Sequence, residues 1–319
     1  MFKTDEEMRS AGPPERYDNT MLTTSDSCMR KFYFFWRGLD FKQKPSYFTF
    51  GSAWQRGQEV WYTTPGEIED RLGAAITAAE QYWEDDGGIE NNNDTKENLK
   101  YLLMFYAIEY ETESWQIIAP AGKMELGFEF PIEGTPYYLC GAIDGYISWP
   151  GYGLLVLENK TAGVYLGDSY MSQWSFSPQV TQYFWGLGKA TGEEPFGVLM
   201  NIASKKLTKK AIQEFKQNMV LPENIFMRNL EKRSRFQIEE FEDHTIAAIR
   251  EIVREWDRWL WPKTKDHMQC SGGIGKSPCL FKRLCLADIH PWEMEEQELL
   301  GPEIKWRGEK WEPWKRGEK

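Results

Sequence analysis

The segment GAIDGYISWPGYGLLVLENKT (residues 141–161) constrains the fold more than any other part of the chain. Two stretches rich in Ile, Val, Leu and Tyr flank the turn-forming sequence Pro-Gly-Tyr-Gly, and this pattern predicts an antiparallel β-hairpin. If the turn is centred near Gly151, Asp144 lies directly opposite Glu158. Lys160 then lies on the same face as Glu158, because strand side chains alternate.

Two opposed carboxylates in an apolar hairpin need a compensating charge. Directly opposed positions lie about 5 Å apart at Cβ, and carboxylates that close repel unless a cation lies between them or one is protonated. Mg²⁺ binds through one or two carboxylates and keeps its waters. We therefore expect Asp144 and Glu158 to hold a metal ion, with the Asn159 carbonyl as a further ligand. Lys160 would orient a water and stabilise charge on a phosphoryl group. A structural ion-pair network with Lys160 is the alternative.

The composition limits the kind of partner that the chain can bind. With 319 residues, 41% of them hydrophobic, the chain is long enough for a sizeable core, and its net charge is −11. Nucleic-acid binding must then rely on a local basic groove. The charged N-terminus lacks a secretory signal, and no apolar run approaches the roughly 20 residues that span a bilayer. We expect a soluble, cytoplasmic protein with reduced thiols.

The order of the patterns predicts an α/β fold, in which a small mixed sheet is flanked by helices. Thr24, Ser25 or Asp26 could cap the first helix, Thr64 a later one and Asp94 the helix after that. A further helix runs from Ser177-Pro178 to about Lys189. We expect six regions: a loose leader (1–20), a helical N-terminal region (21–118), the α/β core (119–205), C-terminal helices (206–262), a Cys-rich segment (263–290) and a polar Trp-rich tail (291–319).

The helix that follows the hairpin carries Gln179 and Tyr183, which share one face because they are four residues apart. An Asp, a β-hairpin, Glu-x-Lys and then a Gln-x-x-x-Tyr helix resemble the PD-(D/E)XK nuclease superfamily, specifically its RecB-type exonuclease branch. The resemblance runs from about residue 23 to residue 290. It implies a restriction-endonuclease-like core over 119–205, Mg²⁺ or Mn²⁺ as cofactor, DNA as partner, and catalytic roles for Asp144, Glu158, Lys160, Gln179 and Tyr183.

One position departs from this resemblance. RecB-type nucleases carry a His in an early helix after a Gly-Ser-Ala-x pattern, whereas FGSAWQRGQE has Gln55 there. A Gln carbonyl can contact a metal or its water, but it is a weaker ligand than imidazole. The change is consistent with altered metal preference, with a one-metal mechanism, with reduced activity or with a degenerate nuclease, and Glu59 is a possible substitute ligand.

The cysteines form a second group with the chemistry of a metal site. Cys270, Cys279 and Cys285 lie within 16 residues, and Cys28 is far away in the sequence. One N-terminal and three C-terminal cysteines resemble the iron–sulfur staple of AddB and of CRISPR-associated exonucleases, although the spacing differs. Four thiolates suit a [4Fe–4S] cluster or zinc, for which His267 is a further ligand, and unligated core thiols are the third alternative. Cys140 is expected to be a core residue.

Taken together, the patterns predict a metal-dependent DNA exonuclease or single-strand nuclease, stapled by an iron–sulfur cluster and acting in recombination, repair or phage DNA processing. A catalytically degenerate DNA-binding or scaffold protein is the first alternative, and a zinc-stapled nuclease acting on RNA is the second. Trp306, Trp311 and Trp314 alternate with basic residues in the tail. They either hold a single strand or pack against the body of the protein.

Overall fold

The computed structural model describes residues 2–272 and 277–315. It divides the chain into two compact units, each built from separate stretches. Unit 1 comprises Met1–Gln43, Glu129–Cys140 and Glu239–Pro313. Unit 2 comprises Lys44–Phe128, Gly141–Ile238 and the last residues from Trp314. The predicted metal-binding hairpin belongs to unit 2, and the four cysteines of the proposed staple belong to unit 1.

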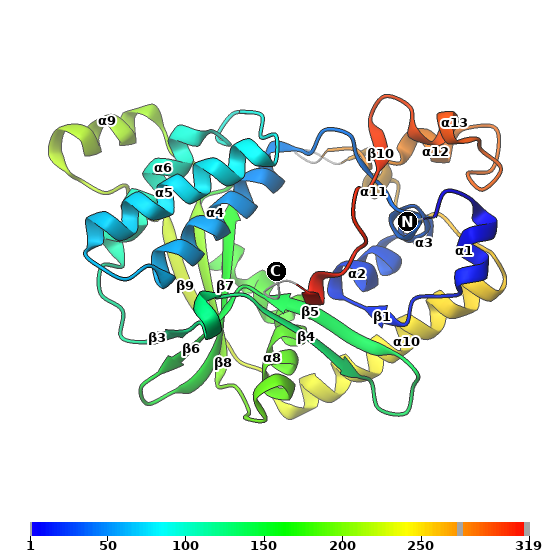
Figure 1. The fold of residues 1–319 in the computed structure, drawn as a ribbon, viewed down its shortest axis with the longest axis horizontal. Coiled ribbons are helices and arrows are strands. Elements are labelled where there is room, and N and C mark those ends of the chain that lie inside the picture. The colour runs from blue at the N-terminus through cyan, green and yellow to red at the C-terminus, as the bar shows by residue number, and fades with distance from the viewer. Residues whose placement is uncertain (1, 273–276, 316–319) are drawn as a thin grey trace. The chain divides into compact units, whose positions relative to one another are not determined.

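Unit 2 is built on a five-stranded mixed sheet in the order β3-β6-β7-β8-β9 (Figure 1). Its strands are β3 (Gln116–Ile118), β6 (Gly145–Trp149), β7 (Gly153–Ala162), β8 (Gly197–Ser204) and β9 (Phe226–Glu231). β7 and β8 are parallel, and the other neighbours are antiparallel. Helices accompany this sheet, so the predicted α/β class with a small mixed sheet is confirmed.

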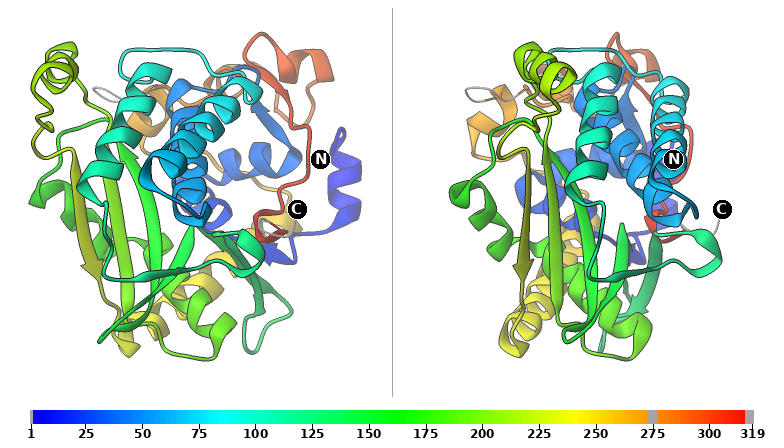
Figure 2. Two further views of the ribbon diagram at one scale, coloured as in Figure 1. Left: turned by 60° about the vertical axis from the view of Figure 1, so that its left-hand side comes forward. Right: turned by 90° about the vertical axis from the view of Figure 1, so that its left-hand side faces the viewer.

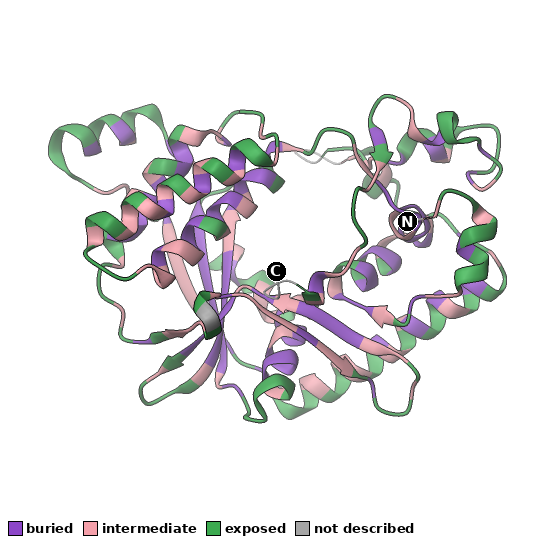
Figure 3. Cartoon of the chain, viewed as in Figure 1, coloured by how far each residue is buried: buried purple, intermediate pink, exposed green. Residues whose placement is uncertain are grey.

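Three long helices of unit 2 pack together beside the sheet (Figure 2). The helices of the unit are α4 (Ser46–Thr63), α5 (Ile68–Asp85), α6 (Lys96–Glu109), η1 (Pro120–Gly122), α7 (Asp168–Met171), η2 (Ser172–Phe176), α8 (Pro178–Thr191) and α9 (Lys209–Asn218). Large aromatic side chains fill the core of α4, α5 and α6, among them Phe50, Trp54, Trp61 and Trp83. β8, an interior strand of the sheet between β7 and β9, is buried along its whole length (Figure 3).

The predicted hairpin register is confirmed. β6 and β7 are antiparallel, and the pairs Gly145–Leu157 and Trp149–Gly153 follow the register inferred from the turn. Asp144 is a bend residue between two strands, because β5 (Tyr138–Ile143) ends just before it. The alternation of side chains between the two faces of a strand therefore does not apply to Asp144. The residue nevertheless lies at the end of β6 that adjoins Glu158.

Unit 1 is mostly helical. Its helices are α1 (Asp5–Ala11), α2 (Asn19–Ser27), α3 (Met29–Arg37), α10 (Arg235–Asp257, shared with unit 2), α11 (His267–Ser271), α12 (Lys282–Leu286) and α13 (Glu296–Leu300), and η3 (Pro313–Lys315) begins at its last residue. Its strands are β1 (Arg16–Tyr17), β2 (Leu39–Phe41) and β10 (Ile304–Trp306), together with parts of β4 (Leu126–Pro131) and β5 that continue into unit 2. They form a β1-β5-β4 sheet and a β10-β2 pair.

The N-terminal region is more ordered than expected, and in the C-terminal tail Trp306 and Trp311 follow the packing alternative. The expected loose leader contains α1, whose start is a capping box between Thr4 and Glu7, and its Met8 is fully buried. In the tail, the indole of Trp311 donates to Asp18 at 2.7 Å and that of Trp306 donates to Glu296 at 2.6 Å. These two tryptophans therefore pack within unit 1.

Three predicted helix starts are wrong. The first predicted helix is two helices, α2 and α3, which meet at Cys28 in an extended conformation. Thr64 ends α4 rather than starting the next helix, and Glu67 precedes α5. Thr95, not Asp94, caps α6, because the Asp94 carboxylate instead binds Ser46 and Lys205. The predicted Ser177 cap of α8 is confirmed, with its hydroxyl accepting from the Val180 N–H.

Within the described part of the chain, every helix is too short or too polar to cross a membrane.

Candidate active site

Asp144 and β7 are joined by a hydrogen bond from the strand backbone to the side chain. The Asp144 Oδ2 atom accepts from the Asn159 backbone N–H at 3.0 Å. A carboxylate thus takes the place of a strand carbonyl where β6 meets the bend, and this holds Asp144 beside the Glu158-Asn159-Lys160 segment. The Asp144 side chain therefore bonds to the backbone of β7 and is also part of the candidate site.

Glu158 is a buried carboxylate in an unfavourable environment. It is 1% exposed, and neither of its oxygens has a hydrogen bond among the described residues. Lys160 Nζ lies 2.5 Å from Glu158 Oε1 as an ion pair outside hydrogen-bond geometry. Burial and then the charge of Asp144 raise the pKa of Glu158 to about 8, against the opposing effect of Lys160. The site therefore has a deficit of positive charge.

Lys160 completes this charged group from the same strand. Burial lowers the pKa of its ammonium, but the negative charges of Glu158 and Asp144 outweigh burial, so the pKa is raised overall. Lys160 thus stays protonated at neutral pH. The three residues that the hairpin argument selected do lie together, as a cation and two carboxylates at the end of β7.

Gln55 contacts the site through its amide nitrogen. From α4, its Nε2 atom donates to Asp144 Oδ1 at 2.7 Å and to Glu125 Oε1 at 2.8 Å. The Gln55 NH₂ group, a neutral donor, therefore lies between the carboxylates of Asp144 and Glu125. A cation would also be attracted to this position. Glu59 pairs instead with Arg56, one turn earlier on α4. Sequence reasoning missed Glu125, because no motif singles out an acid directly before a strand.

Gln179 and Tyr183 lie on α8, as predicted, and contact each other. The Gln179 Nε2 atom donates to the Tyr183 hydroxyl at 2.8 Å, and both side chains are half-buried. α8 packs against β7 and β8. The amide and the hydroxyl thus form one polar pair on one helix face.

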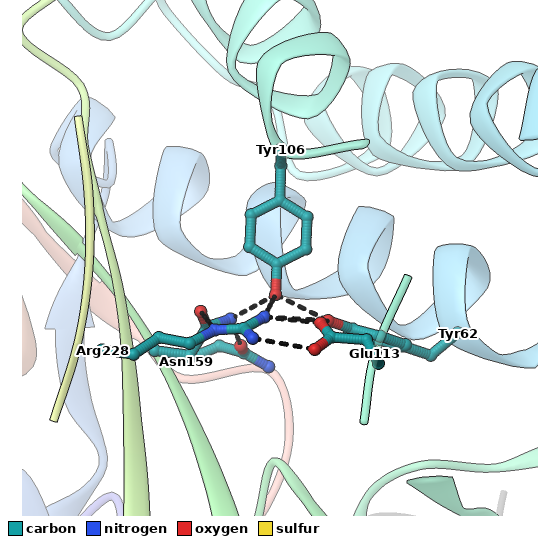
Figure 4. Close-up of polar contacts among 6 residues, drawn as sticks. Tyr62, Tyr106, Glu113, Asn159 and Arg228 are labelled. Carbon is teal, nitrogen blue, oxygen red and sulfur yellow. Dashed lines mark hydrogen bonds and ion pairs between the residues drawn. The ribbon is translucent and has the colours of Figure 1, made fainter. Parts of the chain in front are cut away.

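A row of polar side chains crosses the sheet beside the site. Asn159 on β7 is in register with Asn201 on β8, which is in register with Arg228 on β9. The Asn201 Nδ2 atom donates to Asn159 Oδ1 at 2.7 Å, and the Arg228 Nε atom donates to Asn201 Oδ1 at 3.0 Å (Figure 4). The Asn159 side-chain oxygen is therefore used within the sheet, so only its backbone carbonyl remains a candidate metal ligand.

The row ends in an ion pair covered by tyrosines. The Arg228 guanidinium donates to both oxygens of Glu113, at 2.7 and 2.9 Å (Figure 4). It also donates to the Tyr106 hydroxyl at 2.8 Å, and this hydroxyl accepts from Asn201 as well. Side chains alternate along β7, so Asn159 anchors the strand on the face opposite Glu158 and Lys160. The row fixes the position of the strand that carries them.

We predict that Arg228→Met destabilises the protein by about 3 kcal/mol, because it removes the donor to the Glu113 carboxylate, the Tyr106 hydroxyl and the Asn201 side-chain oxygen. Unfolding in urea measures this loss. The double variant Arg228→Met/Glu113→Gln should regain at least about 1 kcal/mol, since the uncompensated charge is removed as well. A single variant as stable as the unaltered protein would contradict this account of the row.

The cysteines of unit 1 divide as the sequence suggested. Cys140 is fully buried, and its thiol donates to the Tyr17 carbonyl at 3.3 Å, which confirms it as a core residue. Cys28 accepts from the Thr264 backbone N–H at 3.4 Å, and the Cys279 N–H donates to the Cys270 carbonyl at 3.1 Å.

The thiols of this group interact with one another. Burial raises the pKa of Cys279, which is also affected by Cys28 and Cys270. Burial raises the pKa of Cys285 to about 11, with Arg30 opposing the rise and Cys28 and Cys279 adding to it. The four cysteines thus gather in one region, although part of the segment between Cys270 and Cys279 lies outside the described residues.

In the ranges 2–272 and 277–315, no three His, Cys, Asp or Glu side chains are already arranged to hold a metal ion. Asp144 and Glu158 are two carboxylates, which is the number that Mg²⁺ takes before waters and substrate phosphates complete its shell. A buried carboxylate without a hydrogen bond fits such a cation. Cysteine thiolates are suitable ligands for iron or zinc. To bind one ion or cluster, the four thiols must move closer to one another.

Comparison with known proteins does not assign this chain to a family. No family model and no curated protein matches it. A solved structure from Eubacterium rectale, described as a "putative exonuclease", shares 13% identity at a TM-score of 0.46 and covers 91% of this chain and 100% of its own. Another, SSO0001, shares 13% identity at a TM-score of 0.27 and covers 61% of this chain and 73% of its own. Neither likeness is close enough to bear on function.

Proposed function

We propose that this chain is a metal-dependent DNA nuclease of the RecB type, acting as an exonuclease on DNA ends or single strands in recombination, repair or phage DNA processing. The observation that carries the proposal is Glu158, a buried carboxylate without a hydrogen bond that faces Asp144 and Lys160. A structural ion pair needs only one acid for one base. The second acid would give the site an excess of negative charge whenever both carboxylates are ionised. Burial and this repulsion raise the pKa of Glu158, and a divalent cation would relieve the repulsion.

Each residue of the site has a proposed role. Asp144, Glu158 and the Asn159 backbone carbonyl would hold Mg²⁺ or Mn²⁺, which when bound polarises a phosphate oxygen and acidifies a water. Lys160 orients that water and stabilises the charge that develops on the phosphoryl group. The Gln179–Tyr183 pair offers an amide and a hydroxyl to a phosphate or a nucleotide. Gln55 holds Asp144 in place from the opposite side.

The decisive experiment uses anaerobically purified protein and end-labelled DNA. Single-stranded and duplex substrates are incubated with Mg²⁺, with Mn²⁺ and with chelator, and an RNA of the same sequence is run beside them. We expect stepwise shortening of DNA with either metal and none with chelator. Binding without cleavage under every metal would favour the degenerate scaffold, and cleavage of RNA alone would favour the RNA nuclease.

We predict that Gln55→His tightens Mn²⁺ binding about tenfold, because imidazole is a better ligand for transition metals than an amide. Isothermal titration with Mn²⁺ measures this without any substrate. Gln55→Ala is the matched control, since it removes the same hydrogen bonds to Asp144 and Glu125 and adds no ligand. Equal affinities for the two variants would mean that position 55 does not reach the ion.

We also propose that Cys28, Cys270, Cys279 and Cys285 hold a [4Fe–4S] cluster that joins α3 to the C-terminal part of unit 1. The electrostatic interactions of Cys279 and Cys285 with the other thiols support this proposal, and the raised pKa values of these two cysteines mean that a metal must displace their protons to bind. Zinc is the alternative ion. His267, on α11 with Cys270, is the further ligand that zinc accepts.

A further inference from the structure

The segment that joins β7 to α8 carries two exposed aromatic side chains, one near each of its ends. It begins three residues after Lys160 and ends just before the helix of Gln179 and Tyr183. Tyr165 is 67% exposed and Phe176 is 89% exposed, the latter more than any other large hydrophobic side chain among the described residues. Burying such rings in the unbound protein would stabilise it, so their exposure needs an explanation.

A lysine accompanies Tyr165. The Lys206 ammonium lies 4.7 Å from the centre of the Tyr165 ring. Backbone contacts hold the two segments side by side, since the Lys205 N–H donates to the Ala162 carbonyl at 2.9 Å and the Ser204 hydroxyl to the Val164 carbonyl at 2.8 Å. An aromatic ring and a cation are thus fixed together at the carboxyl ends of two parallel strands, which is the edge where α/β sheets bind ligands.

This arrangement matches the chemistry of an unpaired nucleic-acid strand. A base stacks on an exposed ring whatever its sequence, and an adjacent lysine neutralises a phosphate. Lys160 and Lys206 supply positive charge at this edge, although the whole chain carries a net charge of −11. In a duplex the bases are already stacked on each other, so a ring gains little from them.

We propose that Tyr165 stacks on an unpaired base and that Lys206 binds the adjoining phosphate, so that the site takes a single-stranded DNA end. This inference rests on the proposed function, because it names the form of substrate that the same site accepts. Tyr165 and Lys206 act in binding, before any bond is broken.

Binding of fluorescein-labelled dT15 and of the dT15·dA15 duplex, measured by anisotropy in chelator, tests the proposal without catalysis. Tyr165→Ala should weaken binding of dT15 roughly 5- to 150-fold, at about 1–3 kcal/mol per stacked base. Tyr165→Phe, which keeps the ring, should bind within about twofold of the unaltered protein. Duplex binding should change less than about twofold in both variants.

The opposite end of the same sheet supplies matched controls. There Lys232 lies 3.9 Å from the centre of the Phe196 ring, which packs on Tyr152, itself 46% exposed. Tyr152→Ala and Lys232→Ala should leave binding of dT15 unchanged. Lys206→Ala should lower the slope of log affinity against log salt by about 0.7, the value for one phosphate contact on a single strand.

Equal effects of Tyr165→Ala and Tyr152→Ala would overturn the proposal, and so would equal losses for dT15 and the duplex or an unaltered protein that does not bind dT15. None of these results depends on cleavage. A protein that binds dT15 through Tyr165 yet cuts no DNA would keep this inference and remove the nuclease activity.

Discussion

Lys160→Ala is expected to lower the rate of DNA cleavage by about three orders of magnitude, because it removes the only charge of the site that can stabilise the developing phosphoryl oxygen without the metal. The fold should survive. Without the ammonium, which lowers the pKa of Glu158, that pKa rises above its value of about 8, so the buried carboxyl stays protonated and neutral. Single-turnover cleavage of end-labelled DNA measures the chemical step.

Two further variants serve as controls for the loss of activity in Lys160→Ala: one tests a lysine outside the site, and the other tests the Asp144 carboxylate. Lys100→Ala removes an exposed lysine of α6 and should cut at the normal rate. Asp144→Asn keeps an oxygen that accepts the Asn159 N–H but loses the charge, so it should weaken Mn²⁺ binding while DNA binding in chelator is preserved. A Lys160→Ala protein that cuts as fast as the unaltered protein would make the assignment of the site wrong.

Serine in place of Cys28, Cys270, Cys279 or Cys285 is expected to remove the bound metal and to lower the melting temperature by about 10 °C. Cys28 is roughly 240 residues from Cys270 in the sequence, so a link between them closes a very long loop. By analogy with a cross-link, this restricts the unfolded chain by about 5 kcal/mol, and each kcal/mol shifts melting by about 2–4 °C. Absorbance near 400 nm, metal analysis and calorimetry are the three readouts.

Cys140→Ser is the matched control, because a serine hydroxyl can make the same bond to the Tyr17 carbonyl. It should keep the metal content and the colour of the unaltered protein. If metal analysis finds zinc instead of iron, the four cysteines still form a metal site, but the ion is zinc and not a [4Fe–4S] cluster. Protein purified without oxygen that contains neither metal would contradict the staple.

The central hairpin could be predicted from sequence because its determinants are local. The turn residues set the register, and the two-residue alternation places Glu158 and Lys160 on one face. Gln179 and Tyr183 followed from helix spacing for the same reason. The start of α1 was equally local, since Thr4 and Glu7 form the signature of a capping box, but a charged N-terminus was interpreted as a leader.

The remaining features depend on contacts between distant segments. Glu125 contacts Gln55 from 70 residues away, and the Arg228 guanidinium contacts Glu113 from 115 residues away. No periodicity encodes such pairs, because tertiary packing brings them together. The break at Cys28 was missed because the apolar pattern continues through it, whereas the Thr264 N–H that its sulfur accepts lies 236 residues away.

The row of Asn159, Asn201 and Arg228 has a consequence for how this sequence can change in evolution. The middle residue of Glu-x-Lys looks free to vary, but here its amide is one member of a chain of donors and acceptors across three strands. A single substitution at any of the three positions leaves a partner unsatisfied, so neutral drift should pass through paired changes. Relatives with an aliphatic residue at position 159 should lack both the asparagine at 201 and the arginine at 228.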